Sequence, residues 1–184
     1  QIAGGSTGVV TFGYGISPNL GSESVCIGPL ACQNLSGGSA AIIGQSAFLS
    51  STTTGGLTGV GNDIGKFYTG SQPMTLMGVG ALKSCVTCTN SVVIGDFAGQ
   101  NWTTNDGAAN SLTIIGGNGT FSGTAGNGQL FRIIVIGTGS AVNATVNQHE
   151  NVIIGSGIMN TVFRNGSNNL VICTTTACDT AAAG

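Results

Sequence analysis

Hydrophobic residues recur along this chain in short clusters, and nearly every cluster ends at a glycine. These glycines, called anchors here, stand at positions 13, 28, 44, 61, 78, 95, 116, 137 and 155, with Cys173 in the equivalent place. Successive anchor positions are 15 to 21 residues apart. This spacing is too short for a propeller blade or a helical repeat, but it fits one coil of a β-solenoid. The pattern predicts an all-β, parallel β-solenoid (β-roll or β-helix) of about ten short coils. It forms one domain over residues 1–184, with irregular ends at 1–8 and 174–184.

The alternation within each cluster predicts which residues face the interior, because neighbouring residues of a strand point to opposite sides of the sheet. The residue directly before each anchor is large and apolar in every coil, so we expect this column and the column three before the anchors to line the interior. The column directly before the anchors reads Phe12, Ile27, Ile43, Val60, Met77, Ile94, Ile115, Ile136, Ile154 and Ile172.

The column two residues before the anchors is then expected to face outward, and it is also mostly apolar. A sheet that is apolar on both faces is normally covered on both faces. Because the chain offers no helix pattern that could serve as a cover, neighbouring copies are the simplest one. The predicted self-assembly face comprises Cys26, Ile42, Leu76, Val93, Ile114, Val135, Ile153 and Val171.

Composition supports a self-assembling protein and argues against several other classes. Only 5% of the 184 residues are charged and the net charge is -2, whereas ordinary soluble domains carry about 25% charged residues. Nucleic-acid binding requires clustered Lys and Arg, and the four basic residues here are scattered. No apolar run approaches the roughly 18 residues of a membrane-spanning helix. We therefore expect neither a nucleic-acid partner nor membrane insertion.

Catalytic and cofactor-binding patterns are weak. His149 is the one histidine, and the single Gly-x-Ser-x-Gly match, centred on Ser6, lacks the strand–turn–helix context of a nucleophile elbow. The six carboxylates are dispersed and no phosphate-binding loop is present. The sequence therefore predicts a non-enzymatic protein with no catalytic, cofactor or metal site.

Six cysteines form three local pairs: Cys26 with Cys32, Cys85 with Cys88, and Cys173 with Cys178. A zinc site would need two such pairs to meet, yet they lie several predicted coils apart. Even cysteine numbers in an exterior protein favour disulfides. We expect local disulfides rather than free buried thiols.

Three stretches of the repeat resemble a known family. Asn90–Gly99 reads Asn-Ser-Val-Val-Ile-Gly-Asp-Phe-Ala-Gly, and shorter versions occur at Glu150–Gly155 and Ser167–Ile172. These stretches resemble the repeats of trimeric phage tail fibres and of trimeric autotransporter adhesin heads. The resemblance implies a left-handed parallel β-roll in which three chains pack around a shared apolar axis.

The resulting expectation is a structural fibre or adhesion element, exposed outside a cell or on a virion, that is trimeric or otherwise self-assembled. A secreted subunit that polymerises end to end into an extracellular filament is the first alternative, and an ice- or surface-binding solenoid is a weaker one. A cell-surface glycan or another receptor is a possible further partner, with Trp102, Tyr14, Tyr68, Phe67 and His149 as candidate contacts because aromatic rings stack on sugars and anchor interfaces.

Overall fold

The structure is a computed structural model, and it describes a defined subset of the chain. The described residues are 8–16, 20, 23–36, 38–50, 56–68, 73–83, 90–99, 103–104, 109–117, 124–125, 130–138, 152–156 and 170–173.

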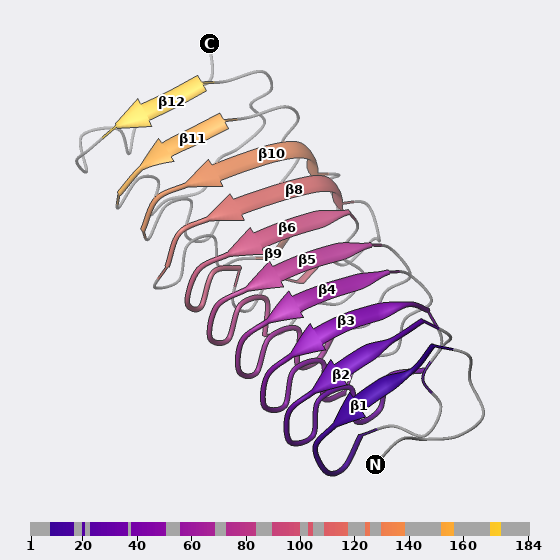
Figure 1. Cartoon of the computed structure of the whole chain (residues 1–184). Coiled ribbons are helices and arrows are strands. Elements are labelled where there is room, and N and C mark those ends of the chain that lie inside the picture. The colour runs from indigo at the N-terminus through magenta and orange to yellow at the C-terminus, as the bar shows by residue number, and fades with distance from the viewer. Residues whose placement is uncertain are drawn as a thin grey trace.

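Ten short strands form one parallel sheet, in which each strand pairs with the strand of the next repeat (Figure 1). The strands, in sheet order, are β1 (Val10–Phe12), β2 (Val25–Ile27), β3 (Ala40–Ile43), β4 (Leu57–Val60), β5 (Met74–Met77), β6 (Ser91–Ile94), β8 (Ala109–Ile115), β10 (Leu130–Ile136), β11 (Val152–Gly155) and β12 (Leu170–Cys173). Two further strands, β7 (Thr103–Thr104) and β9 (Thr124–Ala125), pair separately. The described part of the chain contains no helix, so it offers none that could cross a membrane. The predicted all-β parallel solenoid is confirmed.

The anchor glycines lie where the chain leaves each strand, and the backbone at each of them has a φ between +120° and +156°. This conformation disfavours residues that carry a Cβ. The stacking of the coils adds a second reason for glycine. A Cβ on Gly78 would lie 2.5 Å from the carbonyl oxygen of Gly95 in the next coil. The glycine column is therefore required by close backbone contact between successive bends.

The strands form one wall of each coil, and the residues that follow each anchor form a second. We call this second wall the turn wall; it comprises residues 28–34, 44–50, 61–67, 78–82 and 95–99. The second and fourth residues after each anchor have left-handed backbone, as at Ser46 and Phe48. Their amides donate in opposite directions: Ser46 N–H bonds to the preceding coil at Pro29, and Phe48 N–H to the following coil at Ile64. The turn wall is thus a hydrogen-bonded ladder. Coils with both the strand wall and the turn wall number about five in the described part of the chain, whereas ten coils were predicted.

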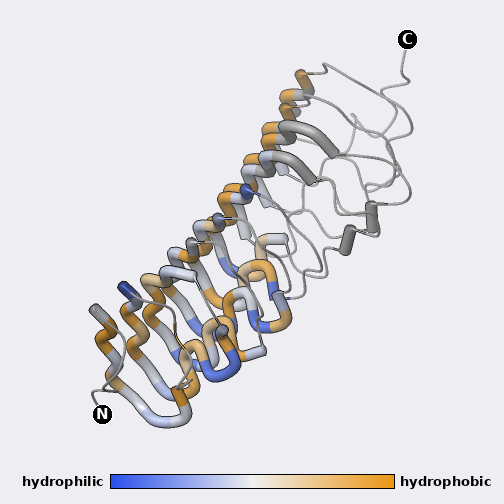
Figure 2. Tube along the Cα trace, turned by 90° about the vertical axis from the view of Figure 1, so that its right-hand side faces the viewer, coloured by the Kyte–Doolittle hydropathy of each residue, from blue (hydrophilic) through white to orange (hydrophobic). Residues whose placement is uncertain are grey.

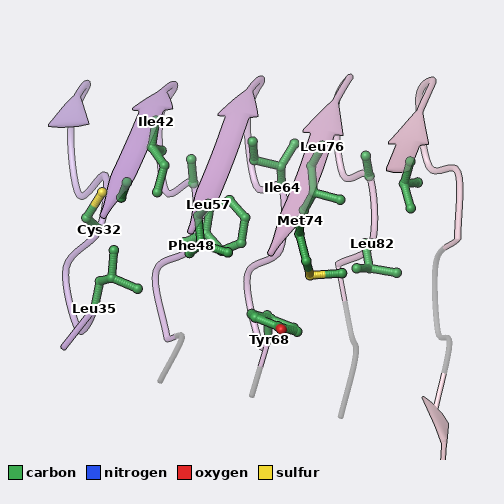
Figure 3. Packing of buried hydrophobic residues seen from close by; sticks show 14 of the residues in the cluster. Cys32, Leu35, Ile42, Phe48, Leu57, Ile64, Tyr68, Met74, Leu76 and Leu82 are labelled. Carbon is green, nitrogen blue, oxygen red and sulfur yellow. The ribbon is translucent and has the colours of Figure 1, made fainter. Parts of the chain in front are cut away.

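The hydrophobic core lies between the strands and the turn wall (Figure 3). From the strands come residues two and four before the anchors, such as Ile42 and Leu57. From the turn wall come residues three and four after the anchors, such as Ile64 and Phe48. Each coil therefore fills its interior with side chains from both of its walls.

The strands face the opposite way from the prediction. Residues two before the anchors are buried, whereas those one and three before them, including Ile43 at 47% and Val10 at 43% exposure, lie on the outside. Alternation shows that residues share a face, but not which face is inside. The buried column two before the anchors mixes small residues, including Gly59 and Thr11, with large ones, and at Gly59 the turn wall's Ile64 and Phe48 fill the space.

Candidate assembly face

The outer side of the ten-stranded sheet is apolar along its whole length. It presents two columns, one and three residues before the anchors, which together we call the outer face. None of its twenty positions holds a charged residue, and only three hold a polar one, namely Thr58, Thr75 and Thr113. The most exposed apolar members are Val10, Phe12, Ile43, Val60, Met77, Ile115, Ile134, Leu170 and Ile172, at 37–66% of their full exposure. In Figure 2 the hydrophobic colour recurs coil after coil along this side.

The outer face is large for an exposed apolar surface. Ten strands about 4.8 Å apart extend roughly 43 Å along the solenoid, and four strand residues extend about 13 Å across it, giving an area of about 560 Å². The largest apolar patch of a typical monomer covers about 300–600 Å² and is often functional. The face therefore lies at the upper end of the range for the largest apolar patch of a typical monomer, and no charge interrupts it.

The relief of the outer face consists of a ridge beside a groove. The column next to the anchors carries long side chains from Ile27 to Ile94 in strands β2 to β6, and these form the ridge. A groove of about 550 Å³ runs beside the ridge over the residues three, four and five before the anchors of the same five coils. Its lining includes the small residues Ser39, Ala41 and Gly56. Among the described residues, ionisable or amide side chains line it only at its two ends, at Glu23 and Asn90.

The residues predicted to form the self-assembly face lie inside the coil instead. Cys26, Ile42, Leu76, Val93, Ile114 and Val135 are completely buried within the chain's own core. Ile153 and Val171 follow in the same backbone register, but their side chains lie outside the described residues. The predicted apolar outer face exists, but it is made of the neighbouring columns.

One predicted disulfide is present, between Cys26 and Cys32, whose Cα atoms are 6.4 Å apart. It joins the strand to the turn wall across the core of one coil, in the place that Ile42 and Phe48 occupy in the next. Both cysteines are fully buried. Cys85, Cys88 and Cys178 lie outside the described residues, as does the side chain of Cys173, so the other two predicted bridges remain predictions.

No known protein family, characterised protein or solved structure shows significant similarity to this chain. The solenoid fold is consistent with the β-roll repeat that the sequence suggested. A relation to trimeric tail fibres or adhesin heads rests on the resemblance of the repeats alone.

The aromatic residues considered for receptor binding do not form one site. Tyr68 is fully buried, where its ring meets that of Phe48 edge-on at 6.3 Å. Tyr14 and Phe67 are exposed at 65% and 47%, but they lie three coils apart. Trp102 and His149 are outside the described residues. Charged contacts are also sparse in the described part of the chain. The ion pair found there joins Lys66 to Asp63 at 3.0 Å on the turn wall.

Proposed function

We propose that this protein is a structural fibre or adhesion element whose copies associate side by side through the outer face. The observation that carries the proposal is the outer face itself: twenty uncharged positions on a regular parallel sheet, most of them apolar, with several large side chains about half exposed. Parallel sheets are normally covered on both faces. Here the chain's own turn wall covers only the inner one.

The size of the outer face is sufficient for a stable contact between copies. Two faces of about 560 Å² bury on the order of 1,100 Å² in total, which exceeds the roughly 1,000 Å² expected of a specific protein interface. Sheets pack face to face at about 10 Å when their side chains interdigitate. A dimer or a closed trimer of such rods would leave the turn walls and loops at the surface, which suits a fibre that presents contacts to a receptor.

The disulfide supports a location outside the cytoplasm. Disulfides persist in oxidising compartments and are rare in reducing ones, and the Cys26–Cys32 bridge is built into the core of one coil. The proposed setting is therefore the cell exterior or a virion surface. This setting agrees with the resemblance of the repeats to trimeric fibres and adhesin heads.

The proposal is tested by placing charge on the outer face. Ile43→Lys combined with Met77→Lys introduces two cations on the outer face, where their burial in an apolar contact would cost several kcal/mol. Sedimentation velocity across a concentration series should show an oligomer for the natural protein and a monomer for the double variant. Gln45→Lys together with Val79→Lys is the matched control, because it adds the same two charges two residues after Ile43 and Met77, at exposed positions of the turn wall.

Two outcomes would count against the proposal. The natural protein could remain monomeric at every concentration, or the outer-face variant could assemble as well as the control variant with Gln45→Lys and Val79→Lys. Circular dichroism of each variant establishes that the solenoid is still folded when its oligomeric state is compared.

A further inference from the structure

We infer that the groove of the outer face receives the ridge of a second copy of this chain, and that the two copies lie parallel, with their coils ascending in the same direction. This inference rests on the proposed function, and it adds the contact surface and the relative orientation. The ridge comprises Ile27, Ile43, Val60, Met77 and Ile94, and the groove is the 550 Å³ depression beside it.

The shapes of the ridge and the groove are complementary. In each coil the ridge residue is at least as large as the outer-face residue beside it on the same strand: Ile43 stands beside Ala41, and Met77 beside Thr75. Farther across the strand, the groove is lined by small residues such as Gly56, where an added Cβ would meet nothing within 4 Å. A column of branched or long side chains therefore fits into the depression without displacing backbone.

The groove has room for the side chains of a second ridge. Its volume is about 550 Å³, and it is open to solvent on the outer face. Side chains that interdigitate across such a contact displace the water and reach the packing density of protein interiors.

The periodicity of the occupant must match that of the groove, and this favours another copy over an unrelated partner. The groove crosses five strands of a parallel sheet, so its subsites repeat at the strand spacing of about 4.8 Å. A ridge from the same sheet has the same repeat, and each of its side chains can occupy one subsite. The lining is mostly apolar, which agrees with an occupant made of Ile, Val and Met.

Symmetry then sets the orientation of the copies. Rotation about an axis parallel to the solenoid reverses the strand direction of the partner, and this places its ridge opposite the groove and its groove opposite the ridge. Rotation about an axis parallel to the strands keeps the strand direction, so ridge would face ridge and groove would face groove. Only the first arrangement fills both grooves. Two copies with parallel solenoid axes can adopt this arrangement, and so can a closed ring of such copies.

Site-directed cross-linking tests this arrangement. Val60→Cys places a thiol on the ridge and Thr58→Cys places one in the groove of the same strand, both on exposed residues. The two variants, one of them carrying an affinity tag, are mixed, allowed to exchange subunits and treated with a short bifunctional thiosulfonate. The natural protein treated in the same way provides the background from native cysteines.

The expected result is a cross-link between the tagged and untagged variants that is at least five-fold more abundant than links within either variant alone. Val60–Val60 links in excess would show ridge against ridge and overturn the parallel arrangement. An oligomer seen by sedimentation but with no links above background would overturn the docking site while leaving self-assembly intact. A monomer by sedimentation would refute the proposed function itself.

Discussion

Replacing Phe48 by alanine is expected to destabilise the solenoid severely, because this side chain reaches into the interior of the following coil. In that coil the two backbone positions that face the Phe48 ring, 59 and 65, are both glycine. The ring of Phe48 lies 3.0 Å from where a Cβ on Gly59 would be and 2.5 Å from where one on Gly65 would be. Ile64 packs beside it, and Tyr68 meets it edge-on. The fully buried ring therefore takes the place of two missing side chains.

The magnitude follows from the difficulty of refilling this space. Removing a buried Phe ring costs about 3–5 kcal/mol, and the cost rises with the cavity that remains. Glycine neighbours have no side chains with which to collapse into the gap, so we expect the upper part of that range. The lost edge-on contact with Tyr68 adds about 0.5–1.5 kcal/mol.

Equilibrium denaturation of Phe48→Ala, compared with Phe67→Ala, measures the effect. Phe67 is 47% exposed on the turn wall, so its truncation should cost about 1 kcal/mol or less. A second test uses Gly59→Val, which should destabilise the natural protein but be better tolerated when Phe48 is already alanine. Equal losses for the two Phe variants, or additive effects of Phe48→Ala and Gly59→Val, would refute the proposed packing.

Three further predictions concern the glycine column, the disulfide and the inner strand face. Gly78→Ala should lower the free energy of unfolding by about 2 kcal/mol or more through backbone strain, while Gly56→Ala, which has open space around it, should be nearly neutral in the same denaturation experiment. Replacing Cys26 and Cys32 together by alanine should cost about 2 kcal/mol, and mass spectrometry without reductant should find these two thiols blocked in the natural protein. Val135→Asp puts a charge into the core at several kcal/mol, so hydrogen exchange should show the neighbouring strands unprotected; normal protection with loss of the oligomer would contradict its burial.

The repeat, the strands and their register could all be predicted from the sequence, because the anchors mark one position of every coil. The structure pairs Ile27 with Ile43 and Val60 with Met77, which is the alignment that the anchors require. The local Cys26–Cys32 bridge was likewise predictable, since the two cysteines are six positions apart and the coil turns back between them.

The side of the sheet that faces inward could not be decided from alternation when residues on both sides are apolar. A clue lay in residue size, since the inner columns mix Gly59, Ser91 and Ala40 with larger residues, while the outer column next to the anchors is large throughout. The turn wall was also missed. It places Leu30 and Phe48 at positive φ, a conformation uncommon for bulky residues. Inter-coil hydrogen bonds stabilise it, and no local sequence signal shows them.

The uneven spacing of the anchors has a consequence for how such a protein can change over evolutionary time. In β3 to β6 the stretch from five residues before the anchor to four after it keeps one backbone plan, because it forms both faces of the sheet, the bend and the start of the turn wall. The variation between 15 and 21 residues must therefore be absorbed in the remaining part of each coil. Apart from changes at Leu35 and Tyr68, which belong to the core, insertions and substitutions there leave the sheet and its outer face untouched. One edge of the rod can thus diversify while the surfaces that fold and assemble it remain constant.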